Sequence, residues 1–405
     1  MADGNGLACG DAQIRIVSRR LIKASDASVA PRVLPVSNLD LLYCNFPLSS
    51  IHCTNEGAEL VVGDAGGAAL SSLDFGAMGA SVRKVQLPYA DEAVALSVQV
   101  VSFACGGFSV AWRTSHLLVD GCALYMLVGT WSEFARSGTT ARPCCALARL
   151  RHAYTPDTGE RLPNVLTNQT FIERLYYIHA SDVERLRMEA SREEGGLRAT
   201  RFEAVSAYLW KTLAAVVGSD DERCRMGWWV NGRRFLEHDR AADMSAYAGN
   251  VTSFAAREAS AEEIRLAPIP DVASLVRAAV AAAANADHFQ ELVDWLEDHK
   301  SERYLEAATV GLGSPTATVT WCAAFRPDTD FGFGRAALAM PPSASGRLCS
   351  AYFTVAAHPG GDGSLFASAF VWPRLAAALE ADGRHIFKPV TAKHLGLTAL
   401  IPSSL

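Results

Sequence analysis

Apolar runs divide this chain into predicted strands and helices. Two β-rich runs, 96–103 and 108–112, flank the turn signal Cys105-Gly106-Gly107, and together they predict a hairpin. The next run, 122–136, is mostly apolar and contains no proline, which predicts a helix. Asp120 stands where the N-cap of that helix is expected.

Similar patterns predict strands and helices over the rest of the chain. Residues 171–178 alternate as a strand does, and 202–211 have the spacing of an amphipathic helix after a cap at Thr200. Ser181 is the expected cap of another helix, and the alanine-rich run 275–295 predicts one packed helix. Further strands are expected at 14–22, 60–62, 225–235, 316–321, 349–356 and 365–372, with a helix at 373–381.

Length and charge limit the class of protein. At 405 residues the chain exceeds the size at which one core stops growing, about 250–300 residues, so two domains are expected. Half of the residues are hydrophobic, and 37 basic residues against 43 acidic ones give a net charge of −6. This balance argues against a nucleic-acid binder.

The other composition signals favour a cytoplasmic protein. The ten cysteines form no C-x-x-C pair, so we interpret them as free buried thiols in a reducing compartment, and no Cys/His cluster suggests zinc. Residues 1–6 do not resemble a signal peptide. The uncharged run 93–112 has the length of a membrane span, but Gln99, the glycines and the β-branched residues favour two buried strands.

His116 is the first candidate for chemistry, because it lies at the exit of a predicted buried strand, where a side chain can face a cleft. A histidine with a pKa of about 6.5 can act as a base near neutral pH. Ser115 points to the opposite face if the strand continues, and no G-x-S-x-G elbow occurs. This pattern favours direct transfer in a ternary complex, whereas a hydrogen-bonded structural histidine is the alternative.

The string Asp330–Arg335 is the second unusual stretch. Two glycines alternate with two phenylalanines after an acid. Glycines allow tight turns and positive φ, the aromatic rings can anchor the loop, and the carboxylate can pair with an arginine. The string alone indicates a structural role.

His116–Gly121, followed some two hundred residues later by Asp330–Gly334, resembles the two signature motifs of the plant BAHD acyl-CoA-dependent acyltransferases. The segments 202–210, 231–234 and 247–250 also resemble recurrent segments of this family. The resemblance therefore extends over nearly the whole chain.

The resemblance implies an α/β fold of two similar-sized domains related to chloramphenicol acetyltransferase, each a mixed sheet with flanking helices. A crossover loop joins them around a central channel, and we place this loop at 150–169. The N-terminal domain is then 1–149, with 335–356 contributed from later in the chain, and the C-terminal domain is 170–405.

The resemblance also implies a mechanism in which acyl-CoA and the acceptor meet at His116. His116 is the general base that removes a proton from the acceptor and then returns it to the CoA thiolate. Trp321 is the candidate oxyanion stabiliser, and a core aromatic residue is its alternative role. Asp120 orients the histidine through an ion pair with an arginine, expected to be Arg233, with Arg234 as the second choice.

Asp330, Gly332 and Gly334 are implied to be architectural and remote from the reaction. Phe333 replaces the usual tryptophan of this motif and Ala336 the usual proline, which leaves the shape of the adjoining loop open.

Two details indicate which enzymes of this fold the chain resembles. Ser115 precedes His116, where chloramphenicol acetyltransferases and condensation domains usually have a second histidine. The string Tyr247–Val251 departs from the corresponding string of anthocyanin-acylating enzymes. The second departure makes glycosylated flavonoid acceptors less expected.

We therefore expect a cytoplasmic, monomeric O-acyltransferase of plant specialised metabolism. It moves a hydroxycinnamoyl, acetyl or similar group from acyl-CoA to the hydroxyl of a small metabolite such as a phenylpropanoid alcohol. We expect no metal, no permanently bound cofactor, no nucleic acid and no membrane partner. An N-acyltransferase, a non-catalytic binding protein and a hydrolase that activates water with His116 are the alternatives.

Overall fold

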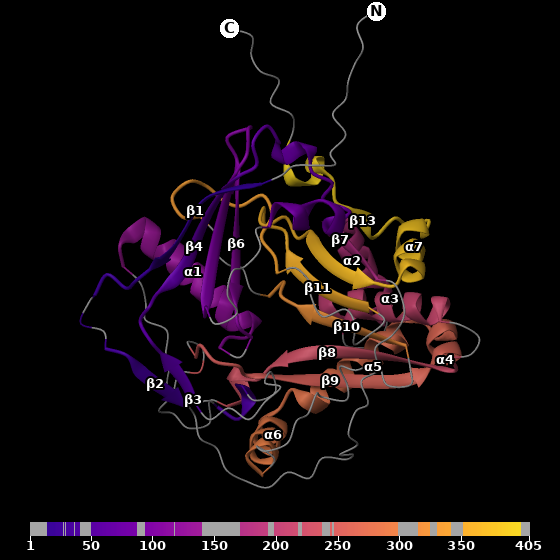
Figure 1. Cartoon of the computed structure of the whole chain (residues 1–405). Helices are drawn as coiled ribbons and strands as arrows, with labels where there is room; N and C mark the ends of the chain where they lie inside the picture. The colour runs from indigo at the N-terminus through magenta and orange to yellow at the C-terminus, as the bar shows by residue number, and fades with distance from the viewer. Residues whose placement is uncertain are drawn as a thin grey trace, which may run out of the picture.

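The computed structural model describes residues 14–26, 28, 30–35, 37–40, 50–86, 94–116, 118–139, 171–192, 198–217, 221–236, 244, 247–298, 315–324, 330–341 and 351–397. Among these, the strands form sheets of four, seven and two strands (Figure 1). The strands are β1 (Arg15–Ile22), β2 (Arg32–Pro35), β3 (Ser50–Cys53), β4 (Ala58–Asp64), β5 (Leu96–Ser102), β6 (Phe108–Thr114), β7 (Ile172–Ile178), β8 (Arg223–Asn231), β9 (Thr252–Ser260), β10 (Thr316–Trp321), β11 (Ala351–Ala357), β12 (Leu365–Val371) and β13 (Lys388–Pro389). The helices are α1 (Gly121–Ser137), α2 (Ala180–Glu189), α3 (Arg201–Val216), α4 (Ala261–Leu266), α5 (Ile269–Ala283), α6 (Ala286–Asp298) and α7 (Pro373–Ala381).

The four-stranded sheet has the order β1-β4-β5-β6 and is mixed, since β4 and β5 are parallel and the other pairs antiparallel. The predicted hairpin is confirmed as β5 and β6. Phe103 donates its N–H to the carbonyl of Gly107 at 2.9 Å, and Gly106 takes φ of 78° in the turn. The uncharged run 93–112 is thus used in two strands. No helix in the described part of the chain is long and apolar enough to cross a bilayer.

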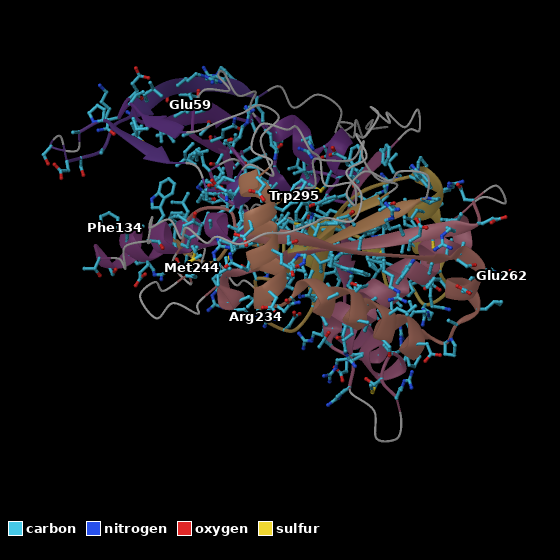
Figure 2. The ribbon with its side chains drawn as sticks, turned by 90° about the horizontal axis from the view of Figure 1, so that it is seen from below. Glu59, Phe134, Arg234, Met244, Glu262 and Trp295 are labelled. Carbon is cyan, nitrogen blue, oxygen red and sulfur yellow. The ribbon has the colours of Figure 1, made fainter. Side chains whose placement is uncertain are left out.

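The seven-stranded sheet has the order β13-β7-β12-β11-β10-β8-β9 and is also mixed. Parallel strands β8, β10 and β11 form its middle, and antiparallel strands extend it on both sides. Figure 2, seen from below, shows the four-stranded sheet near Glu59 on one side of the molecule and the larger sheet and its helices, near Glu262, on the other. The predicted α/β fold of two units, each with a mixed sheet, is confirmed.

Strand β7 shows how one strand serves two cores. Side chains alternate between the faces of a sheet, so residues two apart share a face. Tyr176 and Ile178 belong to the core between the large sheet and its helices. Leu175 and Tyr177 belong to a second core that also contains Val61 of the small sheet. The second core therefore joins the two units, and it explains why this strand is buried on both faces.

Two helix predictions need correction. The alanine-rich run forms α5 and α6 rather than one helix, because Ala284 leaves the helical conformation at φ −97° and ψ 55°. The side-chain oxygen of Asn285 then accepts the N–H of His288 at 2.8 Å, which starts the next helix. Helix α2 is capped by the ring of His179, which accepts the N–H of Ser181, and not by Ser181 itself.

The predicted cap of α3 is confirmed in full. The Thr200 hydroxyl accepts the N–H of Glu203, and the Glu203 carboxylate accepts the N–H of Thr200 at 2.8 Å. This capping box fixes the start of a long, buried helix at the centre of the C-terminal unit.

The expected contribution of 335–356 to the N-terminal unit is wrong for its last part. Residues 351–356 lie in β11, between β10 and β12 of the large sheet. Phe353 and Val355 on one face and Thr354 and Ala356 on the other are all buried, which is typical of a strand in the interior of a sheet that is covered on both faces. The expected crossover loop at 150–169 and residues 342–350 lie outside the described residues.

Candidate active site

The first motif occupies the junction between β6 and α1. Asp120 is the N-cap of α1, as predicted, and its Oδ1 accepts the N–H of Ala123 at 2.8 Å. His116 lies two residues beyond the end of β6, and its side chain is exposed. The expectation of a buried strand is corrected here, because β6 is only half-buried.

Arg233 is the arginine that pairs with Asp120. Its Nη1 lies 2.8 Å from Asp120 Oδ2 and its Nη2 lies 3.0 Å from Oδ1, a bidentate contact. Both side chains are almost fully buried, at 5% and 1% exposure. Arg234 is exposed and its guanidinium lies over the ring of Phe235.

The buried pair is completed by main-chain groups, which a desolvated ion pair requires. Arg233 donates to the carbonyls of Tyr247 and Gly249, the latter at 2.7 Å. Asp120 Oδ2 also accepts the N–H of Val251 at 2.9 Å. The ion pair therefore holds the start of α1 against the loop 247–251.

A second carboxylate holds the same loop. Asp40 Oδ1 accepts both the backbone N–H and the side-chain amide of Asn250, at 3.0 and 2.8 Å. The Asn250 amide also donates to the main-chain carbonyl of His116 at 2.8 Å. Neither Asp40 nor Asn250 is assigned to the site by the sequence alone, although the segment 247–250 resembles a recurrent segment of the family.

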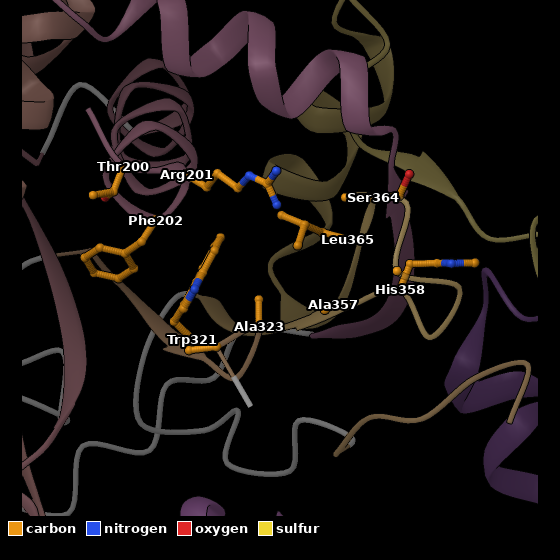
Figure 3. Close-up of a pocket in the computed structure, with 12 residues that line it drawn as sticks. Thr200, Arg201, Phe202, Trp321, Ala323, Ala357, His358, Ser364 and Leu365 are labelled. Atoms are coloured by element: carbon orange, nitrogen blue, oxygen red, sulfur yellow. The ribbon is translucent and has the colours of Figure 1, made fainter. Parts of the chain in front are cut away.

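Trp321 lines a cavity of about 250 Å³ in the C-terminal unit (Figure 3). Its ring packs edge-on against Phe202, with centroids 5.7 Å apart. Arg201, at the first position of α3, contributes a guanidinium to the wall, and Figure 3 shows it between Trp321 and Leu365. Trp321 is thus a half-buried wall residue, and His116 is not among the residues that line this cavity.

Helix α1 also contacts the residue that follows Trp321. The hydroxyl of Tyr125 interacts with the thiol of Cys322. Burial raises the pKa of the Cys322 thiol to about 12, and burial likewise raises the pKa of Tyr125, so both groups stay protonated at neutral pH. This neutral contact places the end of β10 beside the first turns of the helix that follows His116.

The second motif folds around its own aspartate. Asp330 Oδ1 accepts the N–H groups of Gly332 and Gly334, at 2.9 and 3.0 Å. Both glycines have positive φ, 106° and 101°, which side chains disfavour. The guanidinium of Arg136 near the end of α1 donates to the carbonyl of Asp330, so the loop is attached to that helix.

Aromatic rings attach the second motif to the N-terminal unit. Phe331 stacks on Trp112 of β6 and meets Trp131 of α1 edge-on, with centroids 6.2 and 5.9 Å away. Phe333, the residue expected to replace a family tryptophan, is exposed. Its ring meets that of Phe108 edge-on, with centroids 5.0 Å apart. The motif therefore joins β6 and α1, the two elements that flank His116.

The described residues contain no cluster of histidine, cysteine and carboxylate side chains suited to hold a metal ion. Their cysteines are free, at positions 53, 105, 122, 224 and 322. Cys105 departs from the expectation of buried thiols because it is exposed in the turn between β5 and β6.

Known proteins are similar to this chain over much of its length. A family model described as the Transferase family matches residues 47–352. The chain is 23% identical over 263 residues to the omega-hydroxypalmitate O-feruloyl transferase of Arabidopsis thaliana, covering 61% of this chain and 55% of that protein. It is 24% identical over 336 residues to the hydroxycinnamoyl-CoA:piscidic acid hydroxycinnamoyltransferase of Actaea racemosa, covering 73% of each. It is also 23% identical over 312 residues to a hydroxycinnamoyl-CoA:5-hydroxyanthranilate N-hydroxycinnamoyltransferase of Avena sativa, covering 70% of this chain and 68% of that one.

Solved structures share the fold. The F. sporotrichioides TRI101 structure, complexed with coenzyme A and T-2, matches with a TM-score of 0.65 at 17% identity, covering 88% of this chain and 94% of that one. Vinorine synthase matches with a TM-score of 0.64 at 18% identity, covering 93% and 99%. The alignments to two of the curated relatives span little more than half of those proteins, 55% and 57% of their length.

Proposed function

This chain belongs to the Transferase family of BAHD acyltransferases, and from that premise we propose that it moves an acyl group from a coenzyme A thioester to the hydroxyl of a small molecule. The observation that carries the proposal is the fixed main chain of His116 beneath an exposed imidazole. A base that must meet an incoming acceptor needs this combination of rigid support and access.

In the proposed reaction, His116 removes the proton from the acceptor hydroxyl as the oxygen attacks the thioester carbonyl. The tetrahedral intermediate then collapses, the carbon–sulfur bond breaks, and the imidazolium returns its proton to the thiolate of coenzyme A. Asp120 and Arg233 take no proton in this scheme, because their carboxylate and guanidinium are already bonded to each other and to the main chain. The role proposed for Asp120 and Arg233 is to orient the first motif, residues 116–121.

We assign the cavity beside Trp321 to the thioester substrate. Its apolar wall suits an acyl or pantetheine chain, and Arg201 at the start of α3 offers positive charge for a phosphate. The indole N–H of Trp321 is our candidate donor to the oxyanion, and the contact between Tyr125 and Cys322 supports its closeness to the first motif.

The relatives leave the acceptor atom open between oxygen and nitrogen, since both O-acyl and N-acyl transferases are among them. We propose an alcohol acceptor, either a phenylpropanoid alcohol or a fatty alcohol. The names of two relatives support the second, since they pair omega-hydroxypalmitate and a fatty alcohol with feruloyl and caffeoyl donors. The lack of a disulfide spacing pattern among the ten cysteines supports a cytoplasmic location, which we propose with it.

The test is release of coenzyme A from a panel of acyl-CoA thioesters, with and without mixed alcohols and amines. Coenzyme A should be measured by chromatography, because thiol reagents would also react with the exposed Cys105. Release that requires an alcohol supports the proposal, and release that requires an amine moves it to N-acylation. Release without any acceptor indicates a hydrolase, and no release indicates a binding protein.

His116→Ala supplies the matched variant. Its side chain is exposed, so the melting temperature should change little while transfer falls by at least a hundredfold, the usual scale of general-base catalysis. A variant that keeps most of its activity would refute the assignment of the base.

A further inference from the structure

We propose that Asp40 is a positioning residue for the transfer reaction, acting through Asn250 on the main chain of His116. The inference rests on the proposed function, since it supposes that His116 is the base. It adds a carboxylate from a segment far from both motifs, separated from Asn250 by 210 positions in the sequence.

The contact chain is short and continuous. The Asn250 side-chain amide lies 2.8 Å from Asp40 Oδ1 and 2.8 Å from the carbonyl oxygen of His116. An amide nitrogen carries two hydrogens, so it can donate to both acceptors at once. Because Asp40 takes one hydrogen, it fixes the plane of the amide and thereby the direction of the other.

Asp40 is itself held on its second oxygen. Oδ2 accepts the N–H and the hydroxyl of Ser37, at 3.0 and 2.7 Å. The Asp40 residue is 5% exposed and Asn250 is fully buried. Hydrogen bonds to a buried carboxylate are roughly twice as strong as neutral ones, so this arrangement is rigid.

The segment that carries Asp40 is wedged between the loop 247–251 and α6. Leu39 packs in a small core with Tyr247, Val251 and residues of α6. Asn38 donates to the carbonyl of Val293 in α6 at 2.9 Å. The position of Asp40 is thus set by contacts that do not involve the first motif.

Two carboxylates therefore hold adjacent residues of one loop. Asp40 accepts the N–H of Asn250 and Asp120 accepts the N–H of Val251. Asp120 reaches the histidine along the chain, four residues away, whereas Asp40 reaches it through the Asn250 amide. His116 is consequently fixed on both sides, by its own helix cap and by a contact to its carbonyl.

The experiment uses Asn250→Asp, Asp40→Asn and the double variant in the full chain. Asn250→Asp places two carboxylates against each other and removes the donor to His116, so both the melting temperature and kcat should fall. The double variant restores a donor and an acceptor between the two positions but not the donor to the His116 carbonyl. We expect it to regain most of the melting temperature while kcat stays about a hundredfold low, with KM for acyl-CoA near the wild-type value.

Recovery of kcat together with stability in the double variant would overturn the proposal, as would an Asp40→Asn or an Asn250→Asp variant with normal kcat. Tyr208→Phe is the stability control, because it removes the hydroxyl contact with Asp382, which belongs neither to the loop 247–251 nor to the amide bridge. It should lower stability without changing kcat.

A readout independent of turnover separates this inference from the proposed function. The imidazole signal of His116, identified by its loss in His116→Ala, should be single in the wild type and broadened or shifted in the double variant. If the wild type transfers no acyl group, the proposed function fails, and the signal still tests the bridge. An unchanged imidazole signal in the double variant would contradict the proposed bridge from Asp40 through Asn250 to His116.

Discussion

Asp120 and Arg233 form a buried, bidentate ion pair that crosses the boundary between the two units, from the start of α1 to the turn after β8. The two residues are 113 positions apart. Because the pair also binds the loop 247–251, it fixes three segments at one point. The position of the first motif thus depends on the docking of the second unit.

Replacing Arg233 by lysine should cost stability despite keeping the charge. Lysine cannot form the fork that meets both carboxylate oxygens and two main-chain carbonyls. Breaking a buried pair typically costs about 3–5 kcal/mol, so urea unfolding should show a loss of this order for Asp120→Asn and somewhat less for Arg233→Lys. Transfer activity should fall with it.

Arg234→Lys is the control for that series. Arg234 is the neighbouring arginine, but it is exposed and stacks on Phe235. Its replacement should change the free energy of unfolding by less than about 0.5 kcal/mol. Equal losses of unfolding free energy at positions 233 and 234 would show that the ion pair contributes no more to stability than an exposed arginine does.

Much of the fold was predictable because its signals are local. The alternation in β7, the capping box of Thr200 and Glu203, and the glycine turn between β5 and β6 depend on residues a few positions apart. The break between α5 and α6 was not predicted, because the alanines before it all have high helix propensity. The only signal of the break is Asn285, whose side chain caps the start of α6.

The candidate site was predictable only for residues that belong to a recognisable sequence motif. His116, Asp120 and Arg233 could be located from the family resemblance. The bridge from Asp40 through Asn250 could not, since no periodicity relates residues 210 positions apart. Whether Trp321 lies in a core or on a cavity wall is likewise a matter of tertiary packing, which the alternation of β10 does not determine.

Gly334→Ala should destabilise the second motif through the backbone alone. A Cβ at Gly334 would meet no atom within 4 Å, yet φ is +101°. Such a conformation costs a side chain about 1–3 kcal/mol, which thermal unfolding can measure. Gly129→Ala is the opposite control, because Gly129 also has open space but lies inside α1, where alanine should add about 1 kcal/mol. If Gly334→Ala also stabilised the protein, the backbone at Gly334 would not be strained for a residue with a side chain.

Glu203→Gln should lower stability in a pH-dependent way. Burial acts to raise the pKa of Glu203, but hydrogen bonds from Arg277 and Thr200 outweigh it, and the pKa lies below the usual 4.5. A depressed folded-state pKa stabilises the protein above the unfolded pKa and loses that effect as pH falls through the folded value. The variant should therefore be about 1–3 kcal/mol less stable at pH 7, and the difference should shrink as the pH falls below 4.5 and through the folded pKa. A difference that does not shrink anywhere below pH 4.5, down to the acid unfolding of the protein, would exclude a role for the charge.

Trp321→Phe separates the two roles open to this side chain. Phenylalanine keeps an aromatic ring against Phe202 on the cavity wall but has no N–H to donate. If the indole stabilises the oxyanion, kcat should fall about 10²–10³-fold, with KM for acyl-CoA and the melting temperature little changed. Phe202→Leu is the control for wall packing, since it alters the same contact without touching the donor, and it should raise KM more than it lowers kcat. Equal behaviour of the two variants would make Trp321 a packing residue and leave the oxyanion to another donor.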